Sequence, residues 1–373
     1  MTILLLFVTV VAALATATAA VLRYYPAFGR KPAKEHLSRN KMSVNYGEGI
    51  FVNQIPTSLS MNAQDLAPLL KQYMRGIRQR KPRQPLPMAD FDVKKIRSRN
   101  QPAVTWFGHS AALLELDGQA LLLDPMFGLA PSPFPFIGSK RYSRSLPFRI
   151  EHLPRIDAVI LSHDHYDHLD YGSIKKLKDK VQQFIVPLGV GSHLERWGVE
   201  PNRIKQLDWW DEYDCQGIKL VCTPARHFSG RSLHDRNTTL WCSWVVKGKQ
   251  ASVYFSGDSG YGPHFAEIGQ RFGPFDFTLM ECGQYNESWA AIHMMPEQTV
   301  QAHLDVRGGV MLPIHWAAFT LAMHAWTDPI ERVTRRAKEQ GVKVATPRIG
   351  QTVPIIVGSE VDDEAYPNAA WWR

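Results

Sequence analysis

The sequence predicts a layered α/β domain, and two observations point to that class. From Val104 onward, short apolar runs rich in β-forming residues are separated by Gly, Pro and Asp, as expected for strands joined by turns. Helical patterns fall between several of these runs. Together they predict one domain of about 250 residues, an acceptable size for a single core.

The individual elements follow from the local patterns. Nine apolar runs are predicted as strands: Val104–Phe107, Ala112–Leu116, Ala120–Leu123, Ala158–Leu161, Phe184–Pro187, Ile218–Cys222, Ala251–Phe255, Phe277–Met280 and Val310–Ile314. Three segments with helical spacing are predicted as helices: Ser173–Lys180, Pro296–Asp305 and Asp328–Gln340. Pro296 suits a first helical turn, and Asp328 before Pro329 suits a helix cap.

Composition places the 373-residue chain among globular proteins, with one large or two modest domains. The 45% hydrophobic and 21% charged residues exclude a disordered chain, a collagen, a coiled coil and a polytopic membrane protein. Four Cys without a CxxC pair exclude a disulfide framework and a cysteine-built zinc finger. A net charge of +8 and a pI near 9.2 favour polyanions or anionic membranes as partners.

The first 22 residues form an apolar segment without a charged side chain. As a helix it would span ~33 Å, enough to cross a hydrocarbon core. A cleaved signal peptide is the alternative, with export of the mature chain. No Lys or Arg precedes the segment, whereas Arg23, Arg30, Lys31 and Lys34 follow it, so the positive-inside rule favours a retained anchor with a cytoplasmic catalytic domain.

Residues 23–100 are expected to form a basic, Pro-containing extension. Leu66, Leu69, Leu70 and Met74 recur at helical spacing, and a run of Lys and Arg follows them. This segment is either an amphipathic helix on anionic lipid or a solvated basic face leading to a linker. The chain is thus divided into a hydrophobic segment (1–22), the extension (23–100), a hydrolase domain (101–355) and a C-terminal tail (356–373).

One cluster of residues indicates metal chemistry. The strand Ala158–Leu161 is followed by His163, His165, Asp167 and His168. Imidazoles and a carboxylate gathered at a strand end are the ligands that a borderline metal such as Zn²⁺ prefers. A His-rich surface loop would be the alternative.

Three further polar residues follow predicted strands in the same way: His227, Asp258 and His315. Each would be unremarkable alone, because a single histidine more often packs in a core or lies on a surface. As members of a set of seven, they are expected to be metal ligands.

The motif His163-x-His165-x-Asp167-His168, with His227, Asp258 and His315 downstream, resembles the metallo-β-lactamase superfamily over roughly residues 104–351. Further motifs resemble the branch that contains N-acylphosphatidylethanolamine-hydrolysing phospholipase D. They are Trp106-Phe107-Gly108-His109, Leu123-Asp124-Pro125, Asp208-Trp209-Trp210, Gly257-Asp258-Ser259-Gly260-Tyr261, Arg271-Phe272-Gly273-Pro274-Phe275-Asp276 and Ile314-His315-Trp316. The resemblance implies a four-layer αββα sandwich, a dinuclear zinc site and hydrolysis of N-acylphosphatidylethanolamine to an N-acylethanolamine and phosphatidic acid.

The resemblance also implies a role for each residue. Two zinc ions per chain would be held by His163, His165 and His227 on one side and by Asp167, His168 and His315 on the other, with Asp258 bridging them. Asp167, Asp258 and His293 are the implied catalytic residues, and Tyr166 and Tyr171 match tyrosines of the substrate entrance. His109 and His293 are each expected either to orient ligands or transfer a proton, or to be a structural histidine.

Two departures put the exact substrate in doubt. The family has a phosphate-site lysine shortly after the position of His227, whereas this chain has Arg231, which is expected to supply the charge. The family's His-x-Asp-Pro is replaced here by His293-Met294-Met295-Pro296, which loses a carboxylate.

The expected partners are a phospholipid substrate and a membrane surface, and a homodimer is left open. Nucleic acid is not expected, because the basic residues concentrate outside the metal-bearing domain. The alternatives are a lactonase or another phosphodiesterase on the same metals and a non-catalytic membrane-associated scaffold. The scaffold is disfavoured because all seven ligand positions are filled.

Overall fold

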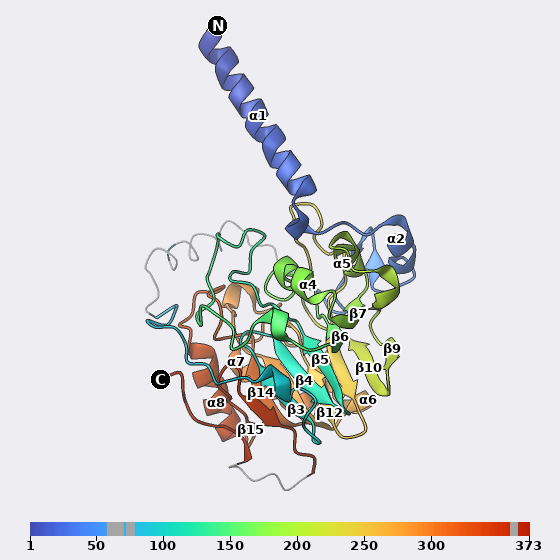
Figure 1. Ribbon diagram of the computed structural model, residues 1–373, viewed down its shortest axis with the longest axis vertical. Coiled ribbons are helices and arrows are strands. Elements are labelled where there is room, and N and C mark those ends of the chain that lie inside the picture. Colours follow the sequence, from blue (N-terminus) through green and yellow to red (C-terminus); the bar gives the residue numbers. More distant parts are fainter. Residues whose placement is uncertain (58–70, 72–78, 359–364) are drawn as a thin grey trace.

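Two seven-stranded sheets packed face to face form the body of the protein (Figure 1). The computed structural model describes residues 1–57, 71, 79–358 and 365–373. In spatial order, the first sheet consists of β16 (Thr352–Pro354), β3 (Ala103–Trp106), β4 (Ala112–Leu116), β5 (Gln119–Leu123), β6 (Ile156–Ile160), β7 (Val181–Pro187) and β8 (Ile204–Leu207). The second consists of β15 (Lys343–Val344), β14 (Gly308–Ile314), β13 (Phe275–Glu281), β12 (Ser252–Phe255), β11 (Ser243–Lys247), β10 (Ile218–Thr223) and β9 (Glu212–Cys215).

Helices cover the outer face of each sheet and complete the sandwich. In the described part of the chain, the α-helices are α1 (Thr2–Tyr24), α2 (Lys34–Asn40), α4 (Tyr171–Leu177), α5 (Gly191–Arg196), α6 (His264–Phe272), α7 (Pro296–Asp305) and α8 (Asp328–Glu339). Short 3-10 helices lie at η1 (Pro26–Phe28), η2 (Val93–Lys95), η3 (Ile150–His152), η4 (Pro201–Arg203) and η5 (Glu287–Trp289), and β1 (Tyr46–Gly47) pairs with β2 (Ile50–Phe51) in a hairpin. Helices α4 and α5 lie on the first sheet, and α6, α7 and α8 lie on the second.

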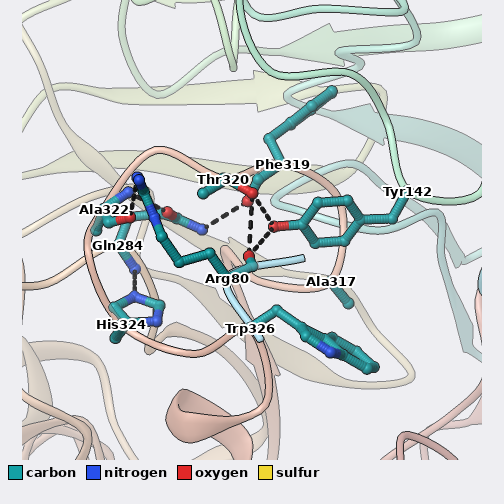
Figure 2. A pocket seen from close by; sticks show the side chains of 9 residues that line it. All are labelled: Arg80, Tyr142, Gln284, Ala317, Phe319, Thr320, Ala322, His324 and Trp326. Atoms are coloured by element: carbon teal, nitrogen blue, oxygen red, sulfur yellow. Dashed lines mark hydrogen bonds between the residues drawn. The ribbon is translucent and has the colours of Figure 1, made fainter. Parts of the chain in front are cut away.

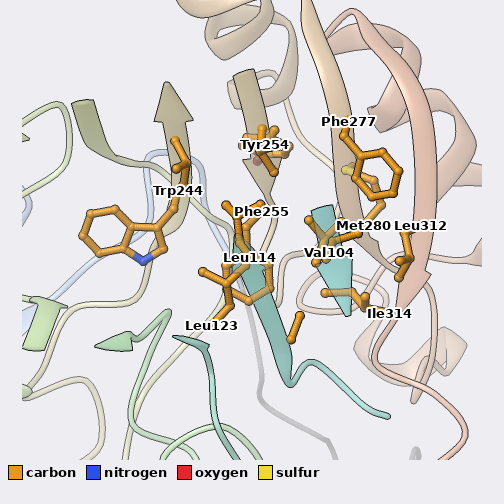
Figure 3. Packing of buried hydrophobic residues seen from close by; sticks show 14 of the residues in the cluster. Val104, Leu114, Leu123, Trp244, Tyr254, Phe255, Phe277, Met280, Leu312 and Ile314 are labelled. Atoms are coloured by element: carbon orange, nitrogen blue, oxygen red, sulfur yellow. The ribbon is translucent and has the colours of Figure 1, made fainter. Parts of the chain in front are cut away.

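Both faces of each sheet are buried, so the strands are apolar at consecutive positions, and successive side chains point to opposite faces. In β4, Leu113 packs with Ile174 of α4, whereas its neighbour Leu114 points into the space between the sheets. Figure 3 shows Leu114 and Leu123 of the first sheet close to Phe255 of the second. Because these side chains are fully buried, truncating Leu114 to Ala is expected to cost about 2–5 kcal/mol.

The strand directions place several strand ends at one edge. Strands β5, β6, β7 and β8 run parallel in the first sheet, and β12, β13, β14 and β15 run parallel in the second. Parallel neighbours end at the same edge, so the loops after β6, β12 and β14 can meet there.

The predicted α/β sandwich is confirmed. All nine predicted strands are present, and the helix predicted at Pro296–Asp305 has those bounds. The sequence did not predict β8, β9, β11, β15 and β16 or the short helices α2, α5 and α6. Several of these strands are short or carry polar residues, as in β9 at a sheet edge, so their patterns are weak.

Helix α1 projects away from the body (Figure 1) and is almost entirely exposed. Its residues Leu4–Tyr24 are long and apolar enough to cross a membrane, a test that a signal sequence passes as well. The predicted helix with Leu66, Leu69, Leu70 and Met74 lies outside the described residues. The boundaries drawn between the four segments of the chain stay a prediction.

Candidate metal centre

The seven predicted ligands converge on one edge of the sandwich. His163, His165, Asp167 and His168 lie in the loop after β6 of the first sheet. His227, Asp258 and His315 follow β10, β12 and β14 of the second sheet. The site is therefore built from both sheets.

Three imidazoles form a first group. His165 Nδ1 lies 2.9 Å from His163 Nε2 and 3.2 Å from His227 Nε2. Burial, followed by the neighbouring imidazoles, holds the pKa of His163 and of His227 well below its usual value. These two rings are therefore neutral and present nitrogen lone pairs.

A second group contains both carboxylates. Asp167 Oδ2 lies 3.3 Å from His315 Nε2 and 3.5 Å from His168 Nε2. Asp258 Oδ2 lies 3.0 Å from both of these nitrogens and 3.9 Å from His163 Nε2. Asp258 thus stands between the two groups.

The electrostatics of the second group favour positive charge. Burial lowers the pKa of His315, but Asp258 and Asp167 outweigh burial and raise this pKa to about 10. The same carboxylates, together with Asp124, overcome burial at His168 and raise its pKa well above the usual value. The buried carboxylate of Asp258 and the largely buried one of Asp167 therefore call for positive charge here, either as protons on the imidazoles or as a bound cation.

The rings are oriented by hydrogen bonds on their far side. His227 Nδ1 contacts the Ile292 carbonyl at 2.9 Å, and His315 Nδ1 contacts the Gly283 carbonyl at 3.2 Å. A carbonyl can only accept, so these Nδ1 atoms carry the hydrogen and Nε2 keeps its lone pair for a metal.

The residues present fit a metal. The Oδ1 atom of buried Asp258 has no hydrogen-bond partner among the described residues, a costly arrangement unless a cation is coordinated. Imidazole nitrogens and carboxylate oxygens are ligands of Zn²⁺ and similar divalent ions. The groups His163–His165–His227 and Asp167–His168–His315 would each hold one ion.

Two buried carboxylates near the ligands were not predicted as site residues. Asp124, at the end of β5, accepts from Ser162 N and contacts His168 Nδ1, both at 2.7 Å. Glu281, at the end of β13, accepts from Met294 N at 2.8 Å and contacts His293 Nδ1 at 3.2 Å. Each occupies the same kind of strand-end position as the ligands, which was the signal available in the sequence.

His109 belongs with the second group. Its Nε2 lies 2.8 Å from Asp167 Oδ2, within the distance range of the ligand atoms themselves. His109, Asp124 and His315 all have positive φ, at 56°, 37° and 67°. Such conformations cost of order 1–3 kcal/mol each and cluster at functional sites.

A cavity of about 380 Å³ opens onto the metal centre. One part of its wall is polar and is lined by His293 and by four of the candidate ligands, His165, Asp167, Asp258 and His315. The other part is apolar. The apolar residues are Phe228, Trp289, Ile292 and Leu321. Arg236 and Gln284 also line it, and Arg236 lies over the Phe228 ring at 4.9 Å.

The structure places Arg231 elsewhere. Its buried guanidinium donates to the backbone carbonyls of Ala27, Leu169 and Asp164, and Tyr166 lies 4.0 Å from it. The cavity lining among the described residues does not include Arg231, Tyr166 or Tyr171. The geometry favours a positioning role for Arg231, and it makes Arg236 the cation at the cavity.

Tyr166 and Tyr171 lie on the same side as Arg231. The Tyr166 hydroxyl donates to the Arg231 carbonyl at 2.6 Å, and Tyr171 packs against Trp197. A substrate contact for either tyrosine stays a prediction.

A polar network braces the loop that follows His315 (Figure 2). The Tyr142 hydroxyl and Thr320 Oγ1 share a hydrogen bond at 2.6 Å, and each lies 3.1 Å from the Arg80 carbonyl, which accepts from whichever hydroxyl keeps its hydrogen free. Gln284 Nε2 donates to the Phe319 carbonyl at 3.1 Å, and its Oε1 accepts from Leu321 N at 2.9 Å. Gln284 thus joins this network to the cavity wall.

Residues 119–316 match the family model of a beta-lactamase superfamily domain. An uncharacterized protein of Mycobacterium tuberculosis is 43% identical over 341 residues, covering 90% of this chain and 88% of that protein. The N-acyl-phosphatidylethanolamine-hydrolyzing phospholipase D 1 of Caenorhabditis elegans is 34% identical, covering 63% of this chain and 69% of that protein.

The fold is also shared with solved structures. The metallo hydrolase Igni18 from Ignicoccus hospitalis superposes with a TM-score of 0.53 at 21% identity, over 69% of this chain and 100% of that chain. At this identity the likeness establishes the fold alone.

Proposed function

Because the chain belongs to the metallo-β-lactamase superfamily and is a metal-dependent hydrolase, we propose that it is a phosphodiesterase of the phospholipase D type. Its substrate would be N-acylphosphatidylethanolamine, cleaved to an N-acylethanolamine and phosphatidic acid. It would bind two Zn²⁺ per chain through His163, His165, Asp167, His168, His227, Asp258 and His315. A relative whose name gives this activity is 34% identical over 248 residues.

One observation supports this substrate above all: the cavity joins the candidate ligands to an apolar wall and to the guanidinium of Arg236. N-Acylation leaves the phosphodiester as the charged group of the lipid, with acyl chains beside it. Phe228, Ile292 and Leu321 offer apolar surface, and the Arg236 guanidinium offers two parallel donors for phosphoryl oxygens. A small, polar lactone would leave this wall unused.

Each side chain has a part in the proposed reaction. When bound, two divalent ions stabilise developing charge on the phosphoryl oxygens and lower the pKa of water. Asp258 and Asp167 would help to hold the ions, and Arg236 orients the phosphodiester. His293 takes a proton from the attacking water and gives it to the leaving alkoxide as the new P–O bond forms and the old one breaks. Glu281 contacts His293 Nδ1, which leaves the ring's Nε2 for that transfer.

Helix α1 is proposed to anchor the protein in the membrane that contains the substrate. The cluster of basic residues after the helix favours a body on the cytoplasmic side. Removal of α1 as a signal sequence, with export of the body, is the alternative.

The test uses the full chain purified in detergent micelles. We expect about two zinc ions per chain by mass spectrometry, turnover of N-acylphosphatidylethanolamine and none of phosphatidylcholine. Asp258→Ala should lose both metal and activity, whereas Arg236→Gln should keep the metal and raise KM. Zinc without lipid turnover would refute the substrate and direct attention to lactones and other phosphodiesters. A folded chain that binds no metal would refute the enzyme.

A further inference from the structure

The chain just after α1 is fixed to the body by a series of hydrogen bonds. Arg196 donates to the carbonyls of Gly29 at 2.6 Å and Arg23 at 3.0 Å, and Trp197 Nε1 donates to the Pro26 carbonyl at 2.7 Å. Arg231 donates to the Ala27 carbonyl at 2.8 Å through Nη2. Helix α1 is therefore not joined to the body by a loose linker.

The length of α1 leaves little space between the body and a membrane. Its 21 residues Leu4–Tyr24 extend ~32 Å, close to the ~30 Å of a hydrocarbon core. If they span the core, the bilayer surface lies at Tyr24, and the first bonds to the body begin at Arg23. Any part of the body that projects beside the helix must then enter the interface.

Exposed apolar side chains lie at the base of the helix, and we call them the base patch: Tyr24, Phe134, Phe136 and Ile137. Phe134 stacks on Tyr25 with ring centroids 4.9 Å apart, and Phe136 lies 5.8 Å from Phe134. Phe136 is 76% exposed, Tyr24 is 70% exposed and Ile137 is 51% exposed. Large apolar side chains this exposed, next to an apolar helix, mark a contact surface.

Charge beside the base patch indicates the kind of surface it meets. Arg23, Arg30, Lys31 and Lys34 are exposed in the same stretch of chain. Basic side chains at this level attract anionic headgroups, while aromatic rings favour the boundary between headgroups and acyl chains.

We propose that the base patch inserts into the anionic phospholipid bilayer that α1 spans and so holds the body in one orientation against it. The inference rests on α1 being a retained anchor, and it deepens the proposed lipid substrate. Arg231 also donates to the Leu169 carbonyl at 2.8 Å and to the Asp164 carbonyl. Through Arg231 the ligand-bearing loop is thus tied to the chain just after α1, so that an insertion of the base patch would also fix the orientation of the metal centre relative to the membrane.

The test places a fluorescent label at the base patch of the full chain. All four native cysteines are buried, so Phe136→Cys introduces one accessible thiol for an environment-sensitive dye. Gln340→Cys is the matched control, because it is exposed at the end of α8, which lies away from α1 in Figure 1. Both variants are reconstituted in vesicles with anionic lipid, and their metal content is compared with that of the unmodified chain.

We expect blue-shifted emission at position 136 and at least about threefold stronger quenching by spin-labelled lipids than at position 340, as for residues ~5–10 Å inside the interface. Equal quenching at both positions would overturn the proposal. Shielding from aqueous quenchers without lipid quenching would overturn it in favour of a protein partner. Loss of residues 1–22 from the mature chain would overturn it in favour of export. Because the fluorescence needs no turnover, failure of the proposed reaction is distinguished from failure of this contact.

A second variant tests the consequence for the reaction. Phe136→Asp is expected to lower the rate on vesicles about tenfold at low substrate mole fraction, since a charge opposes burial of this side chain. The rate on monomeric short-chain substrate and the metal content should stay unchanged. Unchanged kinetics on vesicles would contradict a role of the patch in substrate access.

Discussion

Replacing Asp124 by asparagine changes one buried oxygen to an amide and tests how the metal centre is oriented. Asp124 Oδ1 accepts from Ser162 N at 2.7 Å, so the amide oxygen of the variant must stay there. The new NH₂ group then takes the place of Oδ2, which lies 2.7 Å from His168 Nδ1. Two donors would face each other unless His168 moves its hydrogen to Nε2.

That tautomer removes the lone pair that His168 offers to a metal. Loss of a partner that orients a ligand typically costs 10–100-fold in metal affinity, or about 1.4–2.7 kcal/mol. We therefore expect the apparent Kd for zinc to be 10–100-fold higher in Asp124→Asn. The fold should survive, because the side chain keeps its shape and its bond to Ser162 N.

The assay is chelator competition on the metal-stripped full chain. Asp117→Asn is the matched control, since Asp117 also accepts backbone hydrogen bonds, from Lys249 N and Gln250 N, but in an exposed turn. If Asp124→Asn binds zinc as tightly as this control, the orientation of His168 by Asp124 is refuted.

Three further predictions concern the folded body. Arg231→Gln should destabilise the protein by about 3 kcal/mol in denaturant titrations, because buried carbonyls lose their donor. Arg236→Gln, at an exposed position, should leave stability within ~0.5 kcal/mol. A raised KM without destabilisation in the Arg231 variant would reverse the roles assigned to the two arginines. Gly29→Ala should lower the free energy of unfolding by about 2 kcal/mol more than Gly49→Ala. Both glycines have positive φ, but only at Gly29 would an added Cβ collide, because it would lie 2.0 Å from a histidine ring. Equal losses in the two variants would contradict this reasoning. The pKa of Glu297 is lowered by hydrogen bonds from a guanidinium of α8. Its contribution to stability is therefore fully present above the usual carboxyl pKa and is lost as pH falls through the lowered pKa of the folded state. Glu297→Gln should cost about 0.5 kcal/mol at pH 7, given partial exposure, and progressively less as pH falls below the usual carboxyl pKa; a loss independent of pH would rule this out.

The convergence of the seven candidate ligands could be predicted because its signal is local. Each ligand follows an apolar strand within a few residues, and parallel strands bring such positions to one edge. His163, His165, Asp167 and His168 lie in a single loop, so their proximity needs no knowledge of the tertiary fold.

The roles of Arg231 and Arg236 could not be predicted in this way. They are five positions apart in one loop, and both carry the charge that a phosphate site needs. Their difference arises from contacts distant in sequence, since the Arg231 guanidinium bonds to Ala27, 204 residues away. For Asp124 the strand-end position was a signal, but its role was not, because its partner His168 is 44 residues distant and its own neighbourhood shows no histidine cluster.

The origin of the ligands in both sheets has a consequence for how long the protein persists in a cell. A cation held between the loop after β6 and the loops after β12 and β14 would cross-link the two sheets of the sandwich. The binding free energy would then add to the free energy of unfolding, growing with the logarithm of free metal concentration. Metal starvation would then lower the free energy of unfolding as well as abolish activity. The larger unfolded fraction would be degraded by proteases, so the amount of protein in the cell would depend on metal supply.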